Sequence, residues 1–436
     1  MSEGVLRAGG RYRWSICLLL FLVITINYVD RQVIGVLKPV IEDDLGWTEN
    51  DYANIVLSFQ ASYAVGLLLV GRWLDRIGTR KGLAIAIALW SIAATFHAAA
   101  RTVLQFILAR AVLGIAESAA YPGAVKSVAE WLPQRERALG VGILNAGANV
   151  GVVAAPIAGL MVAGIYGWQA GFFVTGLIGF FVLALWLLFY RRPDEHSKVT
   201  AEELTYIRQD GEDGVGEPLG WAAALRQRQA WYFICAKFFT DPVWYLFLFW
   251  LPDFFVKTQG LDLFPKADSG ILSTIGPALI GVYLLADIGS IAGGWLSSHL
   301  IKTGWTVNRA RKTTLFLAAF CAVPLLFVLQ IDSTIAVVLV LGLATAGHQA
   351  FSANIFTMIS DLYPRRAVAT VAGMGGTAGA VGGMLMAKAA GWSLTAGTYL
   401  PLLIYAGIAY LLAFAVIHLL VPRMAPAPLG TPELVA

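Results

Sequence analysis

Charged side chains lie within the first long apolar segment of the 436-residue chain, where Asn27, Tyr28, Val29, Asp30 and Arg31 follow one another. Inside a bilayer each ion costs roughly 2.5 to 3.5 kcal/mol on insertion scales. A guanidinium stays charged at any pH, and it can bind a carboxylate through two parallel hydrogen bonds. We therefore expect Arg31 to bind an anionic substrate. An internal ion pair that only holds the helices together is the alternative.

Helix geometry separates the two charges of this segment. Successive residues diverge by about 100°, so Asp30 and Arg31 point in different directions. Tyr28 and Arg31 are three residues apart and share a face, so Tyr28 is a further candidate for substrate binding. One of the two charged side chains should line a cavity, and the other should contact a neighbouring helix.

A second set of polar residues lies along the fourth apolar segment. Arg110 and Glu117 are seven residues apart, two turns along one face, and Tyr121 follows one turn later. A glutamic acid in dry surroundings can carry a proton near neutral pH, and a nearby arginine favours its ionised form. This spacing predicts a proton-coupling switch. A structural buried ion pair is the competing interpretation.

Other polar pairs at helical spacing are weaker candidates for binding a hydroxyl-rich ligand. Each could equally form hydrogen bonds between helices. These pairs are Gln60 with Tyr63, Asn145 with Asn149, and His348 with Ser352.

The elements that must position these residues are helices in a membrane. Hydrophobic residues make up 58% of the chain and charged residues 13%, and the mean hydropathy is +0.71. A soluble enzyme is excluded, and no cofactor or metal site is expected. Cys17, Cys235 and Cys321 lie in apolar segments and should only pack. We predict an all-α membrane protein with twelve spans near residues 14–37, 50–71, 80–99, 103–125, 137–165, 169–190, 230–257, 270–299, 311–330, 333–358, 366–390 and 396–421.

The distribution of basic residues predicts the orientation. The first apolar run follows Arg7, Arg11 and Arg13 and is too long for a cleavable signal. With the N-terminus inside, most Lys and Arg fall in cytoplasmic connections, so both termini should be cytoplasmic. This sorting explains the net charge of +4 without nucleic acid. The basic residues that fall outside are Lys38, Arg101, Lys257 and Lys266.

The two halves of the sequence resemble each other. A displacement of 231 positions superimposes Arg80 on Arg311 and Glu130 on Asp361. Such repeats are typical of transporters, whose substrate site lies near the midplane between the halves. We expect six-helix bundles at 1–190 and 230–436, joined by a charged cytoplasmic linker at 191–229 that is a solvated connection.

The segment from Gly71 to Lys81 resembles a motif of the major facilitator superfamily, with Thr79 departing from it. Gly71 would allow close helix approach. Asp75, with Arg76 and Arg80, would close the cytoplasmic side by contacting a neighbouring helix N-terminus or an arginine. Topology-setting charge is the alternative interpretation.

Taken together, the chain resembles the anion:cation symporter family of that superfamily. The matching motifs are the Asn27 to Arg31 segment, Arg110 with Glu117, the Tyr121-Pro122-Gly123 turn and the Glu130-Trp131-Leu132-Pro133 stretch. Within this family, segments such as Phe239-Thr240-Asp241-Pro242-Val243-Trp244 and Gly347-His348-Gln349-Ala350 are similar to bacterial hexuronate transporters.

The resemblance implies import of a sugar-acid anion, such as glucuronate or galacturonate, together with protons. It implies the substrate carboxylate on Arg31, protons on Asp30 and Glu117, and Tyr63 in the sugar pocket. The short loops and the lack of an Asn-x-Ser/Thr sequence favour a bacterial inner membrane, and we expect a monomer. The alternatives are a galactonate or other aldonate symporter, a proton-independent facilitator, an organic-phosphate antiporter, and a membrane sensor.

Overall fold

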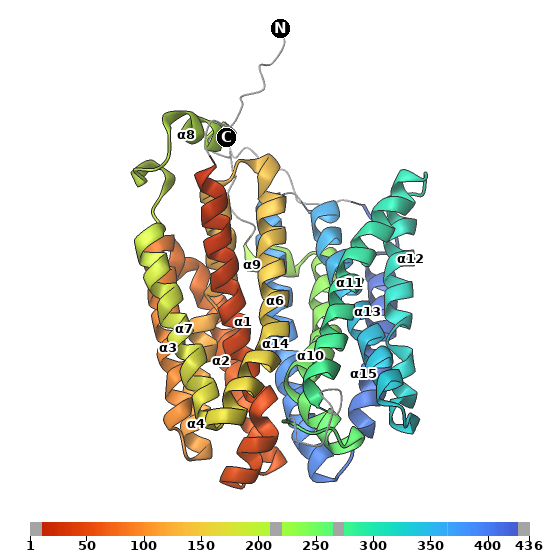
Figure 1. Ribbon diagram of the computed structural model, residues 1–436. Coiled ribbons are helices and arrows are strands. Elements are labelled where there is room, and N and C mark those ends of the chain that lie inside the picture. The colour runs from red at the N-terminus through yellow and green to blue at the C-terminus, as the bar shows by residue number, and fades with distance from the viewer. Residues whose placement is uncertain (1–10, 210–219, 265–273, 364, 426–436) are drawn as a thin grey trace. The chain divides into compact units, whose positions relative to one another are not determined.

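The regular structure of the chain is helical, apart from one isolated bridge between Asp262 and Thr274 (Figure 1). The computed structural model describes residues 11–209, 220–264, 274–363 and 365–425, without a few side chains inside these ranges, such as that of Asp75. The elements are α1 (Tyr12–Leu45), α2 (Glu49–Ile77), α3 (Thr79–Ala99), α4 (Val103–Glu117), α5 (Ala120–Trp131), α6 (Gln134–Tyr166), α7 (Trp168–Phe189), η1 (Pro193–Glu195), α8 (Ala201–Ile207), α9 (Trp221–Leu225), α10 (Arg228–Gln259), α11 (Ile275–Lys302), α12 (Val307–Phe320), η3 (Val323–Gln330), α13 (Thr334–Leu362), α14 (Arg365–Thr395) and α15 (Leu400–Leu420).

Each of the twelve predicted spans corresponds to a helix or to two consecutive helices. Among the described residues, 11 segments are long and apolar enough to cross a membrane. The fourth combines α4 with α5, and the ninth combines α12 with η3. The span predicted at 366–390 lies in α14, which is not among these 11 segments. The all-α membrane fold is therefore confirmed.

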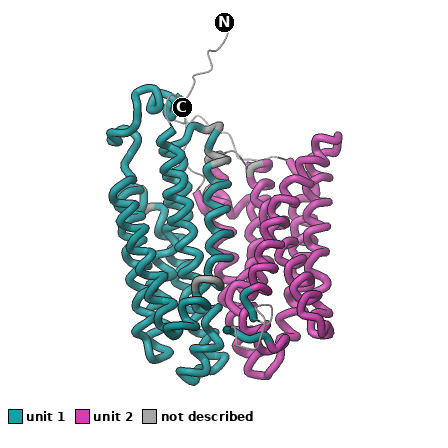
Figure 2. Tube along the Cα trace, viewed as in Figure 1, with its two compact units in different colours: residues 1–214, 261–276 teal, residues 215–260, 277–436 magenta. Residues whose placement is uncertain are grey.

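The chain divides into two compact units (Figure 2). Unit 1 comprises residues 1–214 and 261–276, and unit 2 comprises residues 215–260 and 277–436. In unit 1, α1 packs on α6, α2 on α4 and α3 on α7. In unit 2, α10 packs on α14 and on α15, and α12 packs on α13.

The same close approach between helices recurs in both units. A Cβ at Gly151 of α6 would lie 2.4 Å from the main-chain oxygen of Thr25 on α1. A Cβ at Gly382 of α14 would lie 2.6 Å from the main-chain oxygen of Phe238 on α10. These glycines are 231 positions apart, so the sequence repeat corresponds to a repeated helix contact.

Local signals end the helices that carry the polar residues. Gly46 has a φ of 65° and ends α1, and Thr48 and Asp51 then form a capping box at the start of α2. Gly78 has a φ of 81° and alone separates α2 from α3. Glycine adopts these positive φ values without the strain of a side chain.

The first part of the charged connection packs against unit 1. The Nε of Arg13 on α1 lies 2.8 Å from Glu136 on α6, and its Nη1 lies 3.3 Å from Glu203 on α8. The hydroxyl of Tyr206 also donates to Glu136, at 2.7 Å. Glu203 is 1% exposed, whereas Glu202 is exposed, so this part of the connection forms a surface helix with one buried face. The ion pairs fasten α8 to α1 and α6.

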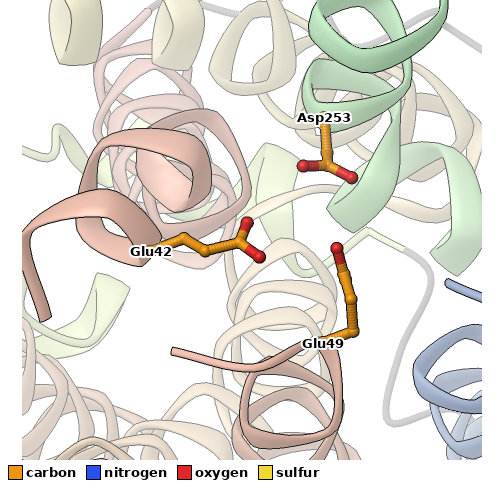
Figure 3. A group of neighbouring side chains, drawn as sticks. All are labelled: Glu42, Glu49 and Asp253. Carbon is orange, nitrogen blue, oxygen red and sulfur yellow. The ribbon is translucent and has the colours of Figure 1, made fainter. Parts of the chain in front are cut away.

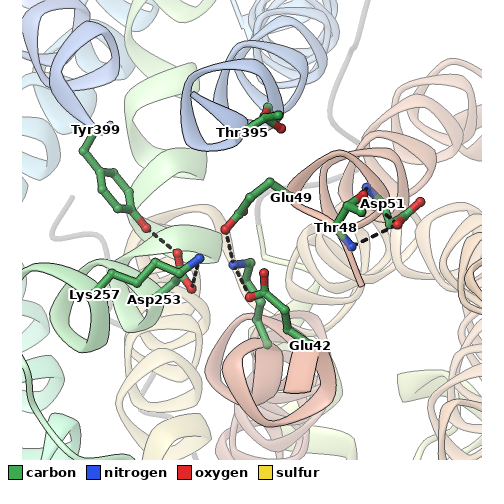
Figure 4. A network of polar contacts seen from close by, with 10 residues as sticks. Glu42, Thr48, Glu49, Asp51, Asp253, Lys257, Thr395 and Tyr399 are labelled. Carbon is green, nitrogen blue, oxygen red and sulfur yellow. Dashed lines mark hydrogen bonds and ion pairs between the residues drawn. The ribbon is translucent and has the colours of Figure 1, made fainter. Parts of the chain in front are cut away.

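Both units carry ion pairs near the ends of their first long helices. In unit 1, the fully buried Nζ of Lys38 lies 2.9 Å from Glu42 and 3.1 Å from Glu49; the two glutamates are labelled in Figures 3 and 4. Lys38 therefore lies within α1, which extends beyond the span predicted at 14–37. In unit 2, Asp253 accepts a hydrogen bond of 2.5 Å from the Tyr399 hydroxyl and pairs with Lys257 at 3.2 Å (Figure 4).

Candidate functional site

A buried ion pair joins the two predicted polar constellations of unit 1. The Nε of Arg31 on α1 lies 2.9 Å from Oε2 of Glu117 on α4. Arg31 is 5% exposed and Glu117 1%. A charge in such surroundings is stable only with a partner, and truncating one partner costs more than the pair itself contributes. The structure thus pairs the predicted anion-binding cation with the predicted proton carrier.

Aromatic rings surround the guanidinium of Arg31. Its Cζ lies 5.0 Å from the ring centroid of Tyr28, 4.7 Å from that of Tyr63 and 5.2 Å from that of Phe59. Each ring face is electron-rich and attracts a cation. Tyr28 and Arg31 therefore share a face, as their spacing predicts. The rings hold the guanidinium in place without neutralising its charge.

Arg110 has a different role from the one its spacing predicts. The expected partner of Glu117 was Arg110, but the observed partner is Arg31. The Nη1 of Arg110 instead donates to the main-chain oxygen of Arg31, at 3.2 Å. Its Nε and Nη2 have no hydrogen-bond partner in the described part of the chain. Arg110 therefore fixes α1 at Arg31 and adds a second buried positive charge near Glu117.

Asp30 lies on another face of α1, as the helical geometry predicts. It is 2% exposed, and its polar neighbour is the hydroxyl of Thr175 on α7. Neither carboxyl oxygen has a partner at hydrogen-bond distance among the described residues. Glu117 and Arg110 are the charged groups that act on it.

The weaker candidates of unit 1 divide into buried and accessible groups. Gln60 is fully buried, and no described residue forms a hydrogen bond with its side-chain amide. Tyr63 is half-buried and stacks on Phe59, with 5.8 Å between the ring centroids. The hydroxyl of Tyr121 donates to Oδ1 of Asn145 at 2.9 Å. Asn145 is exposed and Asn149 half-buried.

Unit 2 has a polar interior of its own. Nδ1 of His348 on α13 lies 2.8 Å from the Tyr410 hydroxyl, and the imidazole stacks on Trp244 with 4.8 Å between the ring centroids. Ser352 is half-buried. On α10, the Nζ of Lys237 lies 2.6 Å from Oδ1 of Asp241. The histidine thus has an aromatic and hydroxyl environment, and the nearest cation pairs with an acid on its own helix.

The predicted cytoplasmic latch is only partly described. The side chain of Asp75 lies outside the described residues, and Arg76 is exposed. The close approach expected at Gly71 is absent, since a Cβ there would meet no described atom within 4 Å. Arg80 donates to the main-chain oxygen of Leu187 at 2.9 Å. This hydrogen bond of Arg80 joins α3 to α7.

Thr79, the residue that departs from the family motif, has a defined partner. Its hydroxyl donates to Glu130 at 2.6 Å, and the hydroxyl of Tyr190 donates to the other oxygen of the same carboxylate at 2.7 Å. In unit 2, Arg311 pairs with Asp361 at 3.1 Å. This ion pair joins α12 to α13.

Sequence reasoning missed four residues of these sites. Phe59 lies four positions before Tyr63, so helical spacing could have identified it. Thr175, Trp244 and Tyr410 belong to long apolar helices in which no spacing marks them. Within each unit taken alone, the described residues bring no three metal-ligating side chains together.

Comparisons with known proteins match the helical arrangement. The sequence profile described as Major Facilitator Superfamily matches residues 20–387. The hexuronate transporter of Escherichia coli strain K12 is 29% identical over 386 residues, covering 87% of each chain. The D-galactonate transporter of Escherichia coli O6:H1 is 26% identical, covering 91% of this chain and 92% of that one. The crystal structure of a bacterial homologue of the human lysosomal transporter Spinster, 18% identical, covers 94% of this chain and 97% of that one with a TM-score of 0.73.

Proposed function

Since this chain belongs to the Major Facilitator Superfamily, we propose that it imports sugar-acid anions together with protons by alternating access. It is a multi-pass membrane transporter and not an enzyme. The preferred substrates under this proposal are hexuronates such as glucuronate and galacturonate. Support comes from the hexuronate and galactonate transporters that it resembles along most of its length.

The observation that supports the proposal best is the buried ion pair between Glu117 and Arg31. The carboxylate of Glu117 lies 2.9 Å from the guanidinium of Arg31, and aromatic rings surround that cation. A substrate carboxylate has the same charge and the same acceptor geometry, so it can replace Glu117 at Arg31. The rings of Tyr28 and Tyr63 would then pack against the sugar.

Proton coupling follows from this competition. Ionised Glu117 holds Arg31, whereas protonated Glu117 is a much weaker partner for it. Binding of a proton at Glu117 therefore favours binding of the anion at Arg31, and the anion favours the proton to the same extent. Asp30 is a second candidate carrier, because its carboxyl group is buried without a charged partner at hydrogen-bond distance in the described chain.

The proposal includes an orientation and a setting. Both termini face the cytoplasm of a bacterial cell, and the chain acts as a monomer in the inner membrane. Arg80, together with Asp75 and Arg76, contributes to closing the cytoplasmic side. The remaining polar candidates, Gln60, Asn145, Asn149, His348 and Ser352, would bind sugar hydroxyls.

Uptake into proteoliposomes tests the coupling. An inside-alkaline gradient should drive glucuronate above its external concentration, because protons entering down their gradient accompany the anion. Equal internal and external concentrations with and without the gradient would identify a facilitator and contradict the proposal. Thermal-shift measurements with glucuronate, galacturonate, galactonate and gluconate identify the substrate, since a ligand of the folded state raises Tm. A larger shift with galactonate would favour the aldonate alternative.

A further inference from the structure

An apolar groove lies between the first turns of α1 and the last turn of α7 in unit 1. Its volume is about 330 Å³. The walls include Leu18, Leu19 and Leu22 on α1 and Leu185 on α7, and Ser15 and Lys198 also line it. We call this feature the α1–α7 groove. Its residues on α1 lie nearer the start of that helix than Arg31, and it shares no residue with the candidate site described above.

The groove opens on the outside of a membrane-spanning unit. Leu18 is 60% exposed and Phe189 is 43% exposed, although both belong to helices apolar enough to cross a bilayer. In such a segment the surrounding medium is hydrocarbon, so exposed leucines contact lipid chains. The apolar walls of the groove fit an acyl chain.

A cation lies at the end of the groove that is nearest to the charged connection. The Nζ of Lys198 is 5.9 Å from the ring centroid of Tyr12 and 5.8 Å from that of Phe189. No described acidic residue forms an ion pair with it. Asp194, an acidic residue close by in the sequence, pairs with Arg208. Lys198 is therefore available to an anion from outside the chain.

Further positive charge surrounds this point. Arg191 and Arg192 directly follow α7 and are exposed. Burial lowers the pKa of His196, and the positive charges of Arg191 and Lys198 lower it further. The charges of Arg191 and Lys198 thus both act at His196, beside the groove. Basic residues next to membrane helices attract anionic lipid headgroups.

We propose that the α1–α7 groove binds one anionic phospholipid, with an acyl chain along Leu18, Leu22 and Leu185 and the phosphate at Lys198 and Ser15. The apolar walls and the cation at one end match the two parts of such a lipid. This inference requires neither the substrate nor the proton coupling proposed above. It assigns a site to the outer surface of unit 1.

Lipid titration of the delipidated, detergent-purified chain tests the proposal. Phosphatidylglycerol should bind and raise Tm more than phosphatidylcholine with the same acyl chains, as followed by native mass spectrometry and thermal unfolding. Lys198→Ala should weaken the apparent Kd for phosphatidylglycerol about fivefold and leave phosphatidylcholine unchanged. Leu22→Trp should fill the groove and weaken binding of both lipids.

Lys302→Ala is the matched control, because Lys302 is an exposed lysine at the end of α11 in unit 2. It should bind phosphatidylglycerol like the unmodified chain. Unchanged phosphatidylglycerol binding by Lys198→Ala would overturn the proposal. The same Tm shift with inorganic phosphate alone would overturn it too, since it would reveal an anion site with no part for the acyl chain.

Discussion

Glu117 in unit 1 and His348 in unit 2 stand 231 positions apart and occupy corresponding spans, but their surroundings differ. Glu117 pairs with the guanidinium of Arg31 and lies near a second arginine. His348 bonds to the Tyr410 hydroxyl and stacks on Trp244. At these corresponding positions, the side chain of unit 1 forms a buried ion pair, whereas that of unit 2 has aromatic and hydroxyl contacts.

Neighbouring residues also determine the partners of a corresponding arginine and acid in each unit. In unit 2, Arg311 pairs with Asp361. In unit 1, Glu130 accepts hydrogen bonds from Thr79 and Tyr190, and Arg80 bonds to a main-chain oxygen. The positions of unit 2 that correspond to the two hydroxyl residues are Ala310 and Val421. Without those hydroxyls, the acid of unit 2 takes its donor from the arginine.

Arg31→Ala is the substitution expected to have the largest effect. It removes the anion-binding cation and leaves the Glu117 carboxyl buried without its partner. Loss of one partner of a buried charge pair costs about 2 kcal/mol or more, so initial glucuronate uptake should fall at least about thirtyfold. Arg31→Lys keeps the charge but not the planar donors, so its initial uptake rate should lie between those of the unmodified chain and Arg31→Ala. Unchanged uptake by Arg31→Ala would contradict the assignment of the anion site to Arg31.

The second comparison predicts unequal effects of one substitution at two corresponding positions. Arg311→Gln breaks an ion pair and a hydrogen bond of 2.8 Å to Ser297. Arg80→Gln removes one hydrogen bond to a main-chain oxygen. Because hydrogen bonds between charged groups contribute more, Arg311→Gln should lower the free energy of unfolding by about 1 kcal/mol more than Arg80→Gln. Equal shifts of Tm would contradict the difference between the units.

His348→Gln should have the smallest effect on transport. Gln can still bond to Tyr410, and the main loss is the ring stacking on Trp244. We expect the KM for glucuronate to rise about threefold, consistent with the energy of one aromatic contact. The dependence of uptake on the proton gradient should be unchanged. A loss of that dependence would place a proton carrier in unit 2.

Much of the fold follows from composition and periodicity, because twelve long apolar segments leave helices as the only stable spanning elements. Two residues three apart on one helix, such as Tyr28 and Arg31, were also predictable as neighbours. The ion pair of Glu117 with Arg31 could not be predicted, because contacts between α1 and α4 depend on tertiary packing that the pattern of a single helix does not encode. The same limit explains why Glu203, in a charged segment of the sequence, is buried against Arg13.

The measurement that tests the central claim most directly is transport by Glu117→Gln in proteoliposomes. Glutamine cannot ionise, so it neither carries a proton nor competes for Arg31 as a carboxylate. We predict that an inside-alkaline gradient no longer drives glucuronate accumulation, while exchange of internal for external glucuronate continues. Glu202→Gln, which changes an exposed carboxylate of α8, should behave like the unmodified chain. Accumulation against a gradient by Glu117→Gln would contradict the account.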